Sequence, residues 1–213
     1  MNNAPAAKFN MIEQQLRPWE VLDGKVLSAI DQINREDFVP EQYKGLAYAD
    51  CQIPLSGTAA MFPPTVEGRL LQALLIDPED HILEIGTGSG YITACLATLG
   101  KQVLSLEIDA NSQQAAAAVL AQLSIDNVIL EHANAFQVTY DQAYNVIAVT
   151  GSVTNVPESL KQALCVGGRL FIIVGESPAM QALLITRVSS NEWTTESLFE
   201  TDLPALNLPT LAI

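Results

Sequence analysis

The sequence predicts an α/β protein with a Rossmann-like sheet, helices on both faces of that sheet, and an N-terminal helical extension. Three observations support this prediction. From residue 80 onward, short apolar runs of strand length alternate with helical patterns, which is typical of a parallel sheet. The first of these runs ends in three alternate glycines. Before residue 80, helical periodicity and prolines replace that alternation.

The N-terminal third is predicted to be helical with a looped ending. Residues 8–34 have apolar side chains at helical spacing, and Pro18 divides them into two helices because proline interrupts a helix. Residues 40–64 contain four prolines and are predicted to form loops and short extended pieces. A leucine stripe predicts a further helix over residues 66–75.

The remaining elements follow in regular order. The tail, residues 202–213, carries no pattern that assigns it to an element. Strands are predicted at 81–85, 102–108, 128–132, 144–149, 169–174, 178–189 and 193–201, and helices at 91–99, 112–123 and 157–164.

Charge argues against a nucleic-acid partner. The formal net charge is −14, so phosphate backbones would be repelled. Residues 1–70 carry a net charge of only −3, and the remainder carries −11. Any attraction for an anionic substrate should therefore come from the N-terminal third.

Cysteine and histidine content argues against a disulfide framework and a metal cluster. The three cysteines, Cys51, Cys95 and Cys165, are widely spaced, and the chain has only two histidines. No basic-then-apolar signal opens the chain, and no apolar run is long enough to span a bilayer. We therefore expect a cytoplasmic protein that binds no metal and no membrane.

The strongest motif is the segment LEIGTGSG at residues 83–90. Its glycines, Gly86, Gly88 and Gly90, allow a sharp turn and let a ligand lie against the backbone. The dinucleotide fingerprint requires a further glycine where Tyr91 stands. Glu84 would repel a pyrophosphate but could attract an ammonium group. The pattern therefore favours S-adenosyl-L-methionine, which carries an ammonium and a sulfonium but no phosphate.

A second acid supports this cofactor. Glu107 ends the next predicted strand, 21 residues after Gly86. An acid at that place can accept hydrogen bonds from both hydroxyls of a ribose.

The segment LEIGTGSGY resembles motif I of class I methyltransferases, and in this form it is similar to the protein-L-isoaspartate O-methyltransferase family. The resemblance covers roughly residues 8–175. It extends to REDFVP at 35–40, AYAD at 47–50 with IPL at 53–55, DNV at 126–128 and VGGRL at 166–170.

The resemblance implies carboxyl methylation of damaged aspartyl residues in proteins, with S-adenosyl-L-homocysteine as the cofactor product. It assigns residues 1–78 to a substrate-side segment and residues 79–213 to the cofactor-binding domain, within one globular unit. It places the catalytic site at Asp50 and at the position of the family's serine. The residues expected to bind the cofactor are Glu84, Gly86, Thr87, Gly88, Gly90, Glu107, Ile108, Asn134, Ala135 and Thr150.

The chain departs from the family pattern at that serine. The family's GxGQTISQP aligns with residues 56–64, so its threonine falls on Ala60 and its active-site serine on Phe62. The family's Gly-Asp pair becomes Ala133-Asn134, whose amide can still hydrogen-bond adenine. Asp50 is compatible with positioning a substrate and equally with capping a turn.

Three functions remain open from the sequence. An ionised carboxylate acceptor would attack the sulfonium methyl without a general base, which suits a chain with few candidate bases. The first function is therefore isoaspartyl methylation of a peptide or protein carboxylate. The alternatives are a methyltransferase of the same fold with another substrate, such as an unidentified small molecule, and a non-catalytic cofactor-binding protein.

Overall fold

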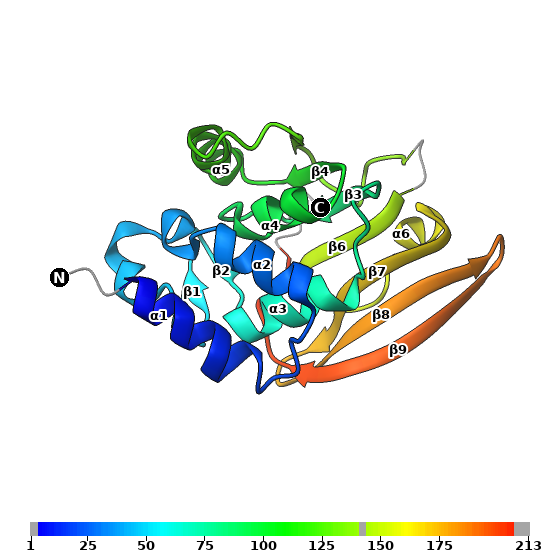
Figure 1. Ribbon diagram of the computed structural model, residues 1–213. Coiled ribbons are helices and arrows are strands. Elements are labelled where there is room, and N and C mark those ends of the chain that lie inside the picture. Colours follow the sequence, from blue (N-terminus) through cyan, green and yellow to red (C-terminus); the bar gives the residue numbers. More distant parts are fainter. Residues whose placement is uncertain (1–3, 141–143, 207–213) are drawn as a thin grey trace.

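A seven-stranded sheet forms the centre of the molecule in the computed structural model, which describes residues 4–140 and 144–206 (Figure 1). The strand order is β5-β4-β3-β6-β7-β8-β9, and β1 and β2 form a separate hairpin. The strands from β5 to β7 are parallel, whereas β8 and β9 continue the sheet antiparallel. The strands are β1 (Ile53–Pro54), β2 (Ala60–Met61), β3 (His81–Ile85), β4 (Gln102–Glu107), β5 (Val128–His132), β6 (Tyr144–Val153), β7 (Leu164–Glu176), β8 (Ala179–Ser189) and β9 (Glu192–Thr201).

Helices cover both faces of the sheet, which confirms the predicted class. One apolar core lies between the sheet and the N-terminal helices together with α3, α4 and α5, and a second core is closed by the short α6. Successive side chains of β3 point to opposite faces of the sheet and so pack into both cores. Ile82 lies in the first core, and Leu83 and Ile85 lie in the second. The helices are α1 (Ala4–Met11), the π-turn η1 (Ile12–Leu16), α2 (Gly24–Gln32), the 3₁₀ turns η2 (Arg35–Phe38) and η3 (Glu41–Leu46), α3 (Pro64–Ala73), α4 (Tyr91–Leu99), α5 (Ala110–Gln122) and α6 (Glu158–Gln162).

Local sequence signals set where these helices begin. The Asp23 side chain accepts hydrogen bonds from the backbone N–H groups of Lys25 and Val26, and so caps α2. Asp109 caps α5 in the same way, by accepting from the Ser112 N–H. These caps satisfy amides that the first helical turn leaves without intrahelical partners.

The predicted boundaries differ from the observed ones mainly around β6 and β7. The helix expected over residues 157–164 ends at Gln162, and β7 begins at Leu164 instead of residue 169. Leu164 pairs with Tyr144 of the neighbouring strand. Pairing between strands therefore places Leu164 in β7, although local periodicity predicted it at the end of the helix. β6 likewise runs on to Val153, beyond the expected end at residue 149.

Part of the unassigned tail returns to the centre of the sheet. The Ser152 N–H donates to the Pro204 carbonyl at 3.0 Å, and the Leu206 N–H donates to the Ser152 carbonyl at 2.9 Å. Residues 203–206 therefore lie beside the carboxyl end of β6. Residues 207–213 of the tail fall outside the described residues. Over the described residues, the helices are too short or too polar to cross a bilayer.

Candidate active site

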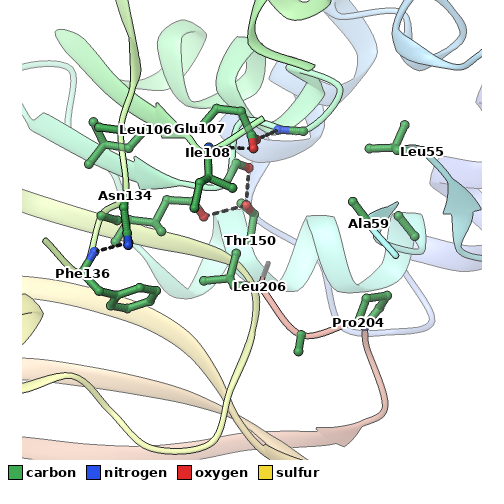
Figure 2. A pocket seen from close by; sticks show the side chains of 18 of the residues that line it. Leu55, Ala59, Leu106, Glu107, Ile108, Asn134, Phe136, Thr150, Pro204 and Leu206 are labelled. Atoms are coloured by element: carbon green, nitrogen blue, oxygen red, sulfur yellow. Dashed lines mark hydrogen bonds between the residues drawn. The ribbon is translucent and has the colours of Figure 1, made fainter. Parts of the chain in front are cut away.

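A cavity opens at the carboxyl ends of the central parallel strands (Figure 2). It encloses about 670 Å³ of space, part of which is continuous with solvent. Open α/β sheets bind ligands at this edge. Its walls come from the glycine-rich turn after β3, the ends of β4 to β6, the loop before α3, and the tail. The lining residues are Leu55, Ala59, Ala60, Phe62, Ile85, Gly86, Gly88, Leu106, Glu107, Ile108, Ala133, Asn134, Ala135, Phe136, Thr150, Gly151, Pro204, Ala205 and Leu206.

Two glycines of the turn have no room for a side chain. Gly86 has a φ of 98°, and a Cβ there would lie 2.6 Å from Thr150 Oγ1. Gly90 has a φ of 85°, and its Cβ would lie 3.0 Å from the Cβ of Ala116 in α5. Gly86 and Gly88 line the cavity, whereas Gly90 allows α4 to approach α5 closely.

Glu107 faces the cavity from the end of β4. Its Oε2 accepts a hydrogen bond from the Gly88 N–H at 2.8 Å, and its Oε1 accepts from the N–H groups of Ile108 and Asp109 at 2.9 and 3.0 Å. These bonds fix the carboxylate against the glycine turn. A carboxylate offers about four acceptor sites, so these three bonds leave about one for a ligand's hydroxyl group.

Glu84 lies beneath the turn and not in the cavity wall. It is fully buried, and its Oε2 accepts hydrogen bonds from Thr93 Oγ1 at 2.5 Å and Ser105 Oγ at 2.6 Å. Thr87 joins this network through a 2.6 Å hydrogen bond between its hydroxyl and that of Ser105. Burial raises the pKa of Glu84 to about 8, against the opposing effect of the two hydroxyl donors. The network therefore supports the turn from below.

The other residues predicted to bind the cofactor meet at the cavity. Ile108 and Ala135 contribute apolar wall, and Asn134 Oδ1 accepts the Phe136 N–H at 3.0 Å. The Thr150 hydroxyl donates to the Ile85 carbonyl at 2.9 Å and also contacts the Gly86 carbonyl (Figure 2). Thr150 thus ties the end of β6 to the glycine turn. In the described parts of the chain, no group of His, Cys, Asp and Glu side chains is arranged to hold a metal ion.

The two positions predicted to be catalytic have different surroundings. Asp50 is exposed and away from the cavity lining, and its Oδ1 accepts hydrogen bonds from the N–H and the hydroxyl of Thr65 in the first turn of α3. These bonds hold the first turn of α3, whose own N-cap residue, Pro63, supplies no side-chain hydrogen bond. Phe62 does line the cavity, and only 4% of its surface is exposed.

Several lining residues were not predicted. Leu55 and Ala59 come from the loop before β2, and Leu206 comes from the tail. The Leu206 side chain lies over Gly151, where a Cβ would meet it at 2.7 Å. No sequence periodicity marks these residues, because they reach the cavity only through the return of distant segments.

A second cavity adjoins the first and shares Phe136, Pro204, Ala205 and Leu206 with it. It encloses about 1330 Å³, including space open to solvent. The rest of its wall comes from Gln52, the end of β6 and the segment that follows it, the β7–β8 turn with Met180, and residues 202–203. Residues 204–206 therefore stand between the two cavities.

Comparison with known proteins identifies the family. The model of the family described as protein-L-isoaspartate(D-aspartate) O-methyltransferase (PCMT) matches residues 7–201. A protein-L-isoaspartate O-methyltransferase of Rhodopseudomonas palustris is 36% identical over 190 residues, covering 88% of this chain and 87% of the relative. One of Koribacter versatilis is 38% identical over 181 residues, covering 84% and 81%. The chain belongs to the PCMT family.

The fold of this PCMT family member also matches a solved structure. A Plasmodium falciparum protein assigned to the protein-L-isoaspartate O-methyltransferases, crystallised with S-adenosyl-L-homocysteine, superposes with a TM-score of 0.81. The match covers 97% of this chain and 99% of that one at 23% identity, so it bears on the fold. The family resemblance seen in the sequence is confirmed by the family-model match and by the relatives at 36% and 38% identity.

Proposed function

We propose that this PCMT family member transfers the methyl group of S-adenosyl-L-methionine to the carboxylate of isoaspartyl residues in proteins. The observation that carries this proposal is the Glu107 carboxylate, held against the Gly86–Gly88 turn at the edge of a cavity in a chain of this family. Family membership gives no support to the two alternatives considered from the sequence, another substrate or a non-catalytic protein.

The cavity residues fit the cofactor. The absence of a Cβ on Gly86 lets the Thr150 hydroxyl approach the turn, and Gly86 and Gly88 both line the cavity. The remaining acceptor site of Glu107 suits a ribose hydroxyl, and the Asn134 amide and the Ile108 side chain suit the edge and face of adenine. None of the lining residues that the structure describes is basic, which suits a ligand without phosphate.

We assign supporting roles to the predicted residues outside this cavity. Glu84 and Thr87 hold the turn through their buried network, and Gly90 sets the approach of α4 to α5. Asp50 fixes the start of α3 next to Phe62. In the same scheme, residues 1–78 form the substrate side and residues 79–213 the cofactor side of one globular unit.

The bound cofactor supplies an electrophilic methyl group. A side-chain carboxylate acceptor is ionised near neutral pH, so the chain need not remove a proton from it. The chain's own residues contribute alignment and the exclusion of water. Leu55 and Phe62 belong to the wall of the first cavity, and residues 204–206 line both this cavity and the second one.

The test is transfer of labelled methyl to an isoaspartyl peptide and to its normal aspartyl counterpart. Transfer to the isoaspartyl peptide alone is the expected result, and Glu107→Ala should reduce it. Equal transfer to both peptides, or to neither, would contradict the proposal.

We also propose a cytoplasmic location, which the three free cysteines support because reducing compartments keep thiols unpaired. Cell fractionation would test it.

A further inference from the structure

A buried arginine lies behind the cavity wall. Arg35 is 0% exposed, and its guanidinium donates four hydrogen bonds. Two go to the carboxylate of Glu67, from Nε to Oε2 at 2.8 Å and from Nη2 to Oε1 at 3.0 Å. The other two go to backbone carbonyls, from Nη1 to Ala47 and from Nη2 to Phe62, both at 2.7 Å.

These contacts join the substrate side of the cavity to its cofactor side. Phe62 belongs to the wall, and Glu67 lies in the first turn of α3. The guanidinium also lies 5.6 Å from the ring centroid of Tyr91, the first residue of α4 after the glycine turn. Phe62, Glu67 and Tyr91 line one small cavity, together with Gly88 and Ser89 of that turn.

Arginine is the side chain that this geometry requires. Its planar fork can donate to both carboxylate oxygens and to two carbonyls at once, whereas the ammonium of lysine is a compact point charge. A buried ion pair adds little net stability over apolar residues of similar size, because both charges lose their hydration. A gain in stability therefore explains the Arg35–Glu67 ion pair poorly. The hydrogen bond from Arg35 to the Phe62 carbonyl in the cavity wall explains it better.

We infer that Arg35 is a positioning residue for methyl transfer: through the Phe62 carbonyl it fixes the wall formed by residues 60–62 relative to the glycine turn. The kinetic part of this inference rests on the proposed function. The floor of the cofactor cavity comes from the ends of β3 to β6 and makes none of the four Arg35 hydrogen bonds. Loss of these bonds should consequently disturb turnover more than cofactor affinity.

The first test is amide hydrogen exchange of Arg35→Lys saturated with S-adenosyl-L-homocysteine, which needs no turnover. Exchange should rise about tenfold or more in residues 53–62 and stay unchanged in β3. The matched control is Arg169→Lys, because Arg169 also pairs with an acid, Asp80, and donates to the Leu75 carbonyl, but lies outside the cavity walls. Unchanged exchange in 53–62, or an equal rise in β3, would overturn the inference.

The second test separates kcat from affinity on the isoaspartyl peptide. Arg35→Lys should lose roughly tenfold to a hundredfold in kcat, the scale expected for a small misplacement of reacting groups. The dissociation constant of S-adenosyl-L-homocysteine, measured by calorimetry, should stay within about threefold of wild type, as expected for a residue that does not touch the cofactor. A kcat equal to that of Arg169→Lys, or a loss of cofactor affinity as large as the loss of kcat, would overturn the inference.

A second variant guards against misfolding of the first. Arg35→Met combined with Glu67→Met removes both charges together, which a fold tolerates better than an unpaired buried charge. It should melt near the wild-type temperature, bind S-adenosyl-L-homocysteine, and show the same rise in exchange over 53–62. If it folds with wild-type exchange there, Arg35 does not position the wall. If the wild type itself fails to methylate the peptide, the proposed function fails, and the exchange experiment still decides the role of Arg35.

Discussion

The Glu107 carboxylate accepts a hydrogen bond from the Gly88 N–H at 2.8 Å, so the acid and the glycine turn form one preassembled unit. This arrangement predicts a specific loss of affinity. Glu107→Ala should weaken S-adenosyl-L-methionine binding by about 1–3 kcal/mol, since buried ligand hydroxyls would lose their acceptor. Calorimetry would measure it, with Glu131→Ala as the control, because Glu131 is an exposed acid on the neighbouring strand β5. Equal cofactor affinities of the two variants would show that Glu107 does not bind the cofactor.

Cofactor choice can be tested directly. The position of the third dinucleotide glycine is held by Tyr91, which is buried and forms the start of α4. We expect S-adenosyl-L-methionine to raise the melting temperature and NAD to leave it unchanged. A ligand present at a hundred times its dissociation constant adds about 2.7 kcal/mol to stability, which thermal-shift titration detects readily. Greater stabilisation by NAD would contradict the assignment of the cavity.

Phe62 stands where the family has its active-site serine, and it is almost fully buried in the cavity wall. Isoaspartyl turnover should therefore be weaker than in a family member that keeps the serine. Phe62→Ser should raise kcat/KM by roughly tenfold to a hundredfold, the range expected for one hydrogen bond to a charged group.

The matched control for that substitution is Phe62→Ala. It creates a similar void, which costs about 3–5 kcal/mol in stability, but adds no hydroxyl. Stability and turnover of both variants should be measured side by side. If serine gives no more activity than alanine, the hydroxyl is not what this wall lacks.

Glu84 predicts an unusual pH dependence of stability. Its pKa is raised by burial to about 8 in the folded state, above the ordinary value of the unfolded chain. Folding therefore retains a proton, and the contribution of Glu84 is fully present below about pH 4.5 and is lost as pH rises toward 8. Glu84→Gln should remove that loss.

The measurement is the free energy of unfolding of wild type and Glu84→Gln at pH 5 and at pH 8. Between pH 5 and pH 8, the free energy of unfolding of the variant should rise relative to that of the wild type by roughly 1 kcal/mol or more per pH unit. Glu131→Gln, an exposed change, should show no such trend. A difference between Glu84→Gln and wild type that stays constant with pH would mean that Glu84 is ionised when folded.

The sequence by itself determined the α/β class and the order of the elements along the chain, and it singled out the glycine turn and Glu107, which line the cavity. These follow from local causes. Alternating strand and helix periodicities specify a parallel sheet. The turn after β3 requires positive φ at Gly86 and Gly90, and this requirement is visible in the sequence as glycines at those positions. Glu107 could be predicted because it ends the strand that pairs beside β3.

Only the tertiary structure decided the rest of the site. Glu84 stands two residues before Gly86, but alternation along β3 points its side chain beneath the turn. Leu206 and the Arg35–Phe62 contact join segments far apart in the chain. Such contacts depend on how loops and the tail return to the sheet, and that path is set by burial and hydrogen bonding across the whole fold, which no local pattern records.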